Sequence, residues 1–194
     1  MCIRDRVIHD PDLKRLHGIN RLVSDTALNE LNQLCPLVPT LEEVLNRYGK
    51  MLHLMVEVKE ELYQEPEKQV LILKNLLSDL EPAKDFHLIS LKQQMLEKIN
   101  FLDNKAKILV AEFNVKELSK IALEKNYAGF AAHYILIGNK VVRKHLKSGQ
   151  KIGVGYPRSK NSLFRELNRR VEWIFSNDAV GLNSIFQTEF KKLQ

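Results

Sequence analysis

The chain has 194 residues, which is enough for one domain with a sizeable hydrophobic core. Its 44% of apolar and 28% of charged residues are an ordinary globular composition, and no apolar run approaches the roughly 18 residues of a membrane-spanning helix. The net charge of +6 comes from dispersed basic residues without a nucleic-acid-binding motif, so we expect no nucleic-acid partner.

The first six residues, MCIRDR, are also the translation of a common sequencing adaptor read from its ATG. We therefore expect residues 1–6 to be a non-native leader and take residues 7–194 as the protein domain. Cys2 belongs to that leader, which leaves Cys35 alone. One remaining cysteine forms no disulfide framework and no paired-cysteine metal site, and it mildly favours a reducing, cytoplasmic compartment.

The predicted elements begin with VIHD (7–10), which reads as the end of a buried strand that Pro11 terminates. Ser24 to Leu34 reads as a short helix or turn. A clear helix follows, because T-L-E-E places Thr40 at the N-cap and Glu43 three positions later, as in a capping box.

From residue 51 onward, short apolar runs alternate with amphipathic segments. The runs predict strands over 51–58, 86–90, 106–112, 128–134, 151–156 and 171–175. The amphipathic segments predict helices that begin near Pro66, 91, Asn114 (an N-cap), 135 and 162, and one after SNDA (176–179), where Ser176, Asn177 or Asp178 would cap it. The basic run KVVRKHLKSGQK (140–151) is either a solvated helix face or a surface for an anion.

Six strand-then-helix units in series predict an α/β fold with a parallel sheet. They fit either an open doubly wound sheet or part of a TIM-type (β/α)8 barrel. A full barrel needs about 250 residues, so this chain falls short by roughly two β/α units.

Side chains alternate between the two faces of a strand, so MLHLMVEVK places His53, Met55, Glu57 and Lys59 on one face. Glu57 and Lys59 would stand at the C-terminal end of the strand, where parallel sheets keep their sites. A carboxylate beside an ammonium group there is either a structural ion pair or a metal ligand next to a phosphate-binding cation.

Two histidines also stand at predicted strand ends. His9 precedes Asp10, and a histidine there can act as general acid or base, although the dipeptide taken alone favours a loop histidine with an ordinary hydrogen bond. His133 follows AGFAA and is a candidate substrate-binding residue, with a satisfied core histidine as the alternative.

Four motifs follow one another with short gaps. They are V-I-H-D-P-D-L-x-R from Val7, SDTALNEL from Ser24, V-P-T-L-E-E-V-L from Val38 and M-V-E-V-K from Met55. In this order they resemble the glycerophosphodiester phosphodiesterase family over residues 7–60, and the resemblance continues more weakly to the C-terminus. Asn177-Asp178-Ala179 and KIGVGYP (151–157) depart from the family's pattern, so no role is carried over to them.

The resemblance implies a TIM-type barrel that holds Ca²⁺ or Mg²⁺ with three carboxylates and hydrolyses a glycerophosphodiester to glycerol 3-phosphate and an alcohol. Two histidines would act as acid and base. Matched to the family's motifs, His9 is one of these histidines, with Asp10 as its supporting neighbour. Glu57 is the third metal carboxylate, and Lys59 is the basic residue two positions on. The alternatives are a lysophospholipase D-like phosphodiesterase and a non-catalytic barrel that binds an anionic partner.

The family's opening His-Arg strand, its Glu-Asn-Thr and its Glu-x-Asp strand have no counterpart in residues 7–194. We therefore expect an N-terminally truncated remainder of a longer enzyme, without roughly the first two β/α units and with little activity of its own. The in-frame DNA upstream of Val7 tests this expectation. The expected partner is a small glycerophosphodiester, with peripheral membrane contact left open; a signal peptide upstream and the oligomeric state are undecided.

Overall fold

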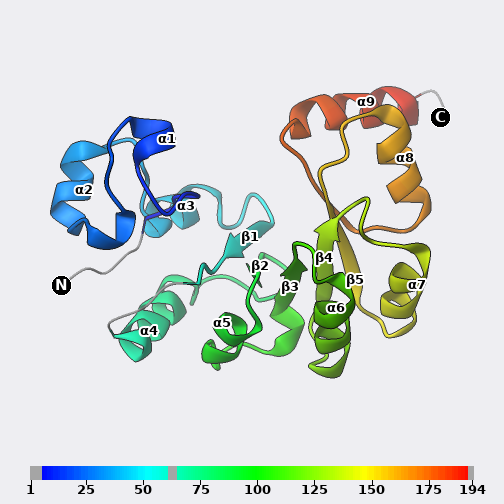
Figure 1. Cartoon of the computed structure of the whole chain (residues 1–194), viewed down its shortest axis with the longest axis horizontal. Coiled ribbons are helices and arrows are strands. Elements are labelled where there is room, and N and C mark those ends of the chain that lie inside the picture. Colours follow the sequence, from blue (N-terminus) through cyan, green and yellow to red (C-terminus); the bar gives the residue numbers. More distant parts are fainter. Residues whose placement is uncertain (1–5, 61–64, 192–194) are drawn as a thin grey trace. The chain divides into compact units, whose positions relative to one another are not determined.

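The computed structural model describes residues 6–60 and 65–191 (Figure 1). Cys2 and most of the predicted leader lie outside these residues. Contacts divide the chain into two compact units, where the sequence predicts one domain. The first comprises residues 1–53 with 63–81, and the second comprises 54–62 with 82–194.

The first unit is helical. Its elements are α1 (Lys14–His17), η1 (Val23–Asp25), α2 (Leu28–Leu34), α3 (Leu41–Tyr48) and α4 (Pro66–Leu76). The buried side chains that hold its N-terminal part together are Leu13, Val23, Leu31, Cys35 and Val38. Burial also raises the pKa of the Cys35 thiol, which keeps it protonated.

The capping box predicted for the third helix is confirmed. The Thr40 hydroxyl accepts the Glu43 N–H at 3.0 Å, and the Glu43 carboxylate accepts the Thr40 N–H at 2.7 Å. The Thr40 N–H, followed by the Thr40 side chain, lowers the pKa of Glu43, because a hydrogen bond to the carboxylate favours its charged form. The capping box also satisfies two of the donors that an α-helix leaves unpaired at its N-terminus.

The strand predicted over VIHD (7–10) is wrong. Arg6 forms a single bridge with Thr40, and the Val7 N–H donates to the Pro39 carbonyl, but the chain then bends. A strand needs a continuous ladder of backbone hydrogen bonds. Within the described residues no other segment pairs with residues 7–10.

The second unit contains a six-stranded parallel sheet whose strands alternate with helices (Figure 1). The strands are β1 (Leu54–Glu57), β2 (Phe86–Ser90), β3 (Lys107–Ala111), β4 (Gly129–His133), β5 (Lys151–Gly155) and β6 (Trp173–Phe175). The helices are α5 (Gln93–Lys98), η2 (Asn104–Ala106), α6 (Val115–Glu124), α7 (Asn139–Lys147), α8 (Lys160–Asn168) and α9 (Ala179–Lys191).

The strands pair in the order in which they follow along the chain, from β1 to β6. A doubly wound sheet reverses its strand order at a switch point, so this order decides against that alternative. Consecutive parallel strands joined by helices are the arrangement of a TIM-type barrel. How many units a complete barrel would add stays a prediction.

The sheet is curled. The rings of His87 on β2 and Trp173 on β6 lie 5.1 Å apart, although β3, β4 and β5 stand between these strands. In a flat sheet four strand spacings amount to roughly 19 Å. Trp173 and Phe175 therefore fill the concave, inner face, together with Met55 and the small residue Ala131.

Some boundaries differ from the sequence prediction. Asn114 precedes α6, but its backbone is not extended and its side chain makes no capping bond. The last helix is capped by Asp178, whose carboxylate accepts the Gly181 N–H at 2.9 Å. α8 begins two residues earlier than predicted, because the Ser159 hydroxyl accepts the Ser162 N–H and so caps it.

Among the described residues, no helix combines the length and the apolar character that crossing a membrane requires.

Candidate functional site

The predicted pair Glu57 and Lys59 is in contact. Glu57 ends β1, and Met55, two residues before it, packs into the inner-face cluster, so Glu57 belongs to the inner face. The Lys59 ammonium lies 2.6 Å from the Glu57 carboxylate, and both side chains are about two-thirds buried. This pair therefore places one negative and one positive group at the C-terminal end of the sheet, where parallel α/β folds carry their sites.

His133 ends β4 and lies on the same face as Glu57. The register aligns Glu57 with Gly129 through β2 and β3, and His133 follows Gly129 by an even number of residues. Its Nδ1 accepts the Ile135 N–H at 3.3 Å, which leaves the proton of the neutral ring on Nε2. The ring also stacks on Tyr134, with centroids 4.9 Å apart. Neighbouring groups thus hold His133 in one orientation.

In the first unit, His9 is oriented by a chain of charged contacts. Its Nδ1 lies 2.8 Å from the Asp10 carboxylate. The Arg15 guanidinium donates two hydrogen bonds to the same carboxylate, from Nε at 2.6 Å and from Nη2 at 3.0 Å. The Arg15 hydrogen bond, followed by that of His9, holds the pKa of Asp10 down to about 2. Asp10 therefore stays ionised and directs the exposed His9 ring, which is the arrangement that a general acid or base needs.

The sequence interpretation missed the role of Arg15. Its signal was present, because Arg15 is the last residue of the quoted V-I-H-D-P-D-L-x-R motif. The spacing brings the guanidinium back to Asp10, because α1 begins at Lys14, just after the Pro11 turn. Bidentate contact with a carboxylate suits the planar fork of arginine.

The predicted residues fall into two groups. His9 and Asp10 belong to the first unit, whereas Glu57, Lys59 and His133 belong to the second. Within the second unit, Glu57 contacts Lys59. In the part of the chain that the structure describes, no hydrogen bond or ion pair links His133 to Glu57.

A divalent metal site is not complete among the described residues. Ca²⁺ takes six to eight oxygen ligands from carboxylates, carbonyls and waters, and Mg²⁺ takes six, usually with one or two carboxylates among them. Across residues 6–60 and 65–191, no group of three or more His, Cys, Asp or Glu side chains is placed to hold a metal ion. Glu57 is moreover engaged by Lys59. These residues alone do not fit a Ca²⁺ or Mg²⁺ centre.

No protein-family model matches the sequence, and no curated protein matches it either. Solved structures do match. A glycerophosphodiester phosphodiesterase from Thermotoga maritima is 21% identical, with a TM-score of 0.72 over 97% of this chain and 79% of its own. An Oleispira antarctica phosphodiesterase, solved with the product sn-glycerol-3-phosphate, is 18% identical, with a TM-score of 0.74 over 94% of this chain and 79% of its own.

A third match is a glycerophosphodiester phosphodiesterase from Parabacteroides distasonis, which is 18% identical, with a TM-score of 0.68 over 95% of this chain and 78% of its own. At identities this low, the matches show a shared fold, and no residue role is carried over from them. The TM-scores, each over more than nine-tenths of this chain, show that the three matched structures share its fold. The chain therefore has the fold of the glycerophosphodiester phosphodiesterases.

Proposed function

We propose that this chain carries part of the active site of a metal-dependent phosphodiesterase that hydrolyses glycerophosphodiesters to glycerol 3-phosphate and an alcohol. The observation that carries the proposal is the Glu57–Lys59 pair at the C-terminal end of β1, in a fold shared with a glycerophosphodiester phosphodiesterase and a phosphodiesterase of known structure. That the Oleispira antarctica protein was solved with sn-glycerol-3-phosphate supports the product class.

The proposed roles follow from the chemistry of each group. Hydrolysis breaks the bond between phosphorus and the leaving alkoxide and forms one from phosphorus to a water oxygen. His9, held by Asp10, gives a proton to the leaving oxygen, and the proton that the attacking water loses passes to a second base, the role that the family resemblance gives to its other histidine. The Lys59 ammonium draws the phosphate, and His133 contacts the substrate through its Nε2.

Glu57 is proposed as one carboxylate ligand of Ca²⁺ or Mg²⁺. A hard cation would neutralise phosphate charge. Since the described residues do not complete such a centre, any cation at Glu57 needs further ligands from outside them. We also propose that the protein acts in glycerol and lipid metabolism, because both follow from the substrate class.

The test is the release of glycerol 3-phosphate from glycerophosphocholine with and without Ca²⁺ or Mg²⁺. It is run on the 194-residue chain and on the product of any in-frame extension upstream of Val7. Glu57→Gln should lower metal-dependent release by roughly tenfold or more, because it removes a charged ligand. Glu60→Gln is the matched control, because Glu60 lies three residues on and pairs with Lys92 instead.

Equal activity of the two variants would show that Glu57 does not belong to the active site. If neither the 194-residue chain nor the extended protein releases glycerol 3-phosphate in a metal-dependent way, the proposed function is contradicted. Lysophosphatidylcholine is assayed alongside. Release of lysophosphatidic acid from it, without hydrolysis of glycerophosphocholine, would favour the lysophospholipase D-like alternative.

The incomplete metal site supports a second candidate, a non-catalytic barrel that binds an anionic partner. This candidate predicts saturable binding of glycerophosphocholine or glycerol 3-phosphate without turnover under every metal condition. Hydrolysis that depends on Glu57 would exclude it.

A further inference from the structure

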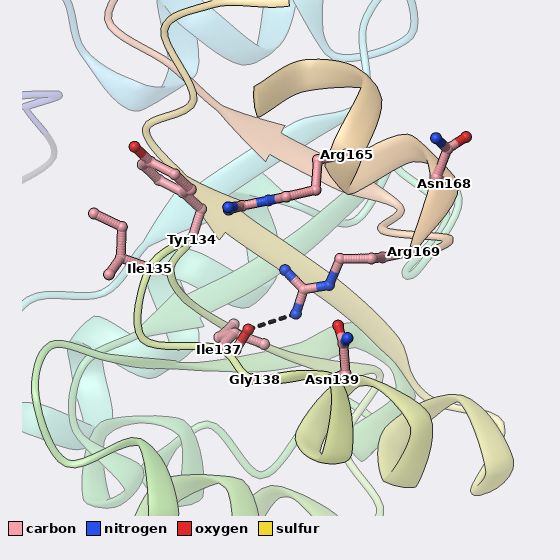
Figure 2. A pocket seen from close by; sticks show the side chains of 8 residues that line it. All are labelled: Tyr134, Ile135, Ile137, Gly138, Asn139, Arg165, Asn168 and Arg169. Atoms are coloured by element: carbon pink, nitrogen blue, oxygen red, sulfur yellow. Dashed lines mark hydrogen bonds between the residues drawn. The ribbon is translucent and has the colours of Figure 1, made fainter. Parts of the chain in front are cut away.

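The second unit contains a pocket of about 540 Å³ that shares no residue with the Glu57–Lys59 pair. It lies between the loop that follows β4, the first turn of α7 and the C-terminal half of α8 (Figure 2). Its walls are largely apolar, and the side chains of Tyr134, Ile135 and Ile137 contribute to them. Two arginines from α8 and the turn after it, Arg165 and Arg169, reach into this space.

Both arginines are held in place before any ligand binds. Arg165 lies over the Tyr134 ring at 5.1 Å, and its Nε and Nη2 each contact Glu166 at 2.7 Å. Arg169 contacts the other oxygen of Glu166 at 2.7 Å and donates to the carbonyl of Ile137. A guanidinium that is already fixed loses little conformational entropy when it binds an anion.

The charges around the pocket do not balance. Glu166 is fully buried and carries one negative charge against the two positive charges of Arg165 and Arg169. No Asp or Glu occurs between Glu124 and Glu166 in the sequence, so the β4–α7 loop and α7 bring no further carboxylate. One positive charge is therefore left over beside a mostly apolar cavity, and the 51% exposure of the Arg165 side chain leaves it open to an anion from solvent.

The polar groups of the pocket wall add donors. Asn139 is the first residue of α7, and the first N–H groups of an α-helix have no partner within the helix. The side chains of Asn139 and Asn168 make no hydrogen bond to any residue that the structure describes, and both line the pocket. Figure 2 shows the Asn139 amide directed from the start of α7 toward Arg169.

We propose that this pocket is a second ligand site and that it binds a phosphate monoester through Arg165, Asn139 and the start of α7. Tyr134 and Ile137 would pack against the organic part of the ligand. Arg169 acts as a positioning residue, because its contacts hold the Ile137 carbonyl and Glu166. The ligand is either a soluble phosphate ester or the head group of a phosphatidic acid in a membrane, since both present the same oxyanion.

The site would also be coupled to His133. Tyr134 follows His133 directly and stacks on its ring, and Ile135 donates to its Nδ1. A ligand that packs against Tyr134 therefore touches the loop that orients His133. This coupling concerns a histidine of the proposed active site, but binding in the pocket does not depend on the proposed hydrolysis.

The test is calorimetric titration of the 194-residue chain with inorganic phosphate and with glycerol 3-phosphate. Cosedimentation with phosphatidylcholine vesicles, with and without phosphatidic acid, is measured in parallel. Asn139→Asp places a carboxylate in the pocket at a helix N-terminus, where a negative charge stabilises the helix, so the variant should fold. It should weaken binding by roughly tenfold or more through charge repulsion.

Asn161→Asp is the matched control. It adds the same charge to the first turn of α8, at an exposed residue outside the pocket, and should leave affinity within about twofold. Arg165→Gln should also weaken binding, whereas Arg143→Gln, at an exposed arginine of α7, should not. Circular dichroism melts show that each variant is folded.

Binding of inorganic phosphate or glycerol 3-phosphate that Asn139→Asp weakens would identify a soluble ligand. Binding only of vesicles with phosphatidic acid, weakened in the same way, would identify the lipid. Absence of saturable binding in every arm would overturn the proposal. Equal weakening by Asn139→Asp and Asn161→Asp would do so too, because it would show attraction to the net positive charge rather than to a site.

Discussion

Single residues show how surroundings decide what a histidine can do. The His9 side chain is 76% exposed and meets a carboxylate, whereas His145 on α7 is fully buried. The His145 Nε2 lies 2.8 Å from the Ser119 hydroxyl, and its Nδ1 lies 2.6 Å from the Gln150 carbonyl oxygen. Serine, histidine and an orienting group in a row are reminiscent of a nucleophile with its base, but no substrate reaches them. They form a structural network.

Gln150 determines which ring nitrogen of His145 carries the proton. Its amide nitrogen donates to the carbonyls of Ala122 and Tyr127, at 2.6 and 2.9 Å, so its oxygen faces His145 as an acceptor. His145 must then carry its proton on Nδ1 and accept from Ser119 on Nε2. A second proton would place a charge in a fully buried site, and this burial lowers the pKa of His145 below its ordinary value of 6.5.

We therefore predict that the free energy of unfolding falls as the pH is lowered below about 6.5. In that range the unfolded chain binds a proton at His145 that the folded chain excludes, so each step down in pH favours unfolding. The contribution of one proton is at most about 1.4 kcal/mol per pH unit. Urea unfolding between pH 5 and 8 measures it.

His145→Gln lowers stability at every pH, but it should flatten this dependence because the titrating group is gone. His17→Gln, at a half-buried histidine of α1, is the control and should keep the dependence of the unchanged chain. An unaltered slope in His145→Gln would show that other groups cause the acid sensitivity.

At the scale of elements, local chemistry determined what could be predicted. The strand over 86–90 is correct to the residue, and the helix start at Pro66 is confirmed. β-branched and aromatic runs between turn residues carry this information locally. VIHD has the same apolar start, but residues 7–10 have no strand partner among the described residues, and pairing is a property of the fold. The N-cap predicted at Asn114 is wrong for a similar reason, because the backbone conformation of that residue decides whether its side chain can cap the helix.

The capping box of α3 gives a prediction at this scale. Thr40→Ala removes the hydroxyl that accepts the Glu43 N–H, and it should lower the free energy of unfolding by about 1 kcal/mol. Thr40→Ser keeps the hydroxyl and should stay within a few tenths of a kcal/mol of the unchanged chain. Denaturant unfolding followed by circular dichroism distinguishes the two. Similar stability of the two variants would mean that solvent replaces the cap without loss.

At the scale of the whole molecule, more of the fold class than of the candidate site could be predicted from the sequence. Alternation of strands and helices predicted a parallel sheet, but it left open a doubly wound sheet, because strand order arises from pairing. Glu57 and Lys59 could be paired from their spacing on one strand. The pocket of Arg165 and Asn139 could not be predicted, because its walls come from three elements that meet only in the fold.

The curl of the sheet depends on small residues of its inner face. Gly153 on β5 faces the Phe175 ring, and a Cβ atom there would lie 2.8 Å from that ring and 2.9 Å from the Cβ of Ala131. Neither the ring nor the Ala131 strand can withdraw freely, since both belong to the inner-face cluster. Gly153 therefore lets β5 and β6 close over that cluster.

Gly153→Ala should lower the free energy of unfolding by about 1–3 kcal/mol, because an extra methyl group overpacks the inner face. Gly155→Ala is the matched control on the same strand and face, where a Cβ meets nothing within 4 Å, and it should be neutral or slightly stabilising. Trp173 is the only tryptophan, so its fluorescence reports on this face during unfolding. A shifted Trp173 emission in folded Gly153→Ala, but not in Gly155→Ala, would show that the sheet opens to admit the methyl group. Equal stability and equal emission of the two variants would contradict the role of Gly153, because the curl would then tolerate a side chain at its tightest contact.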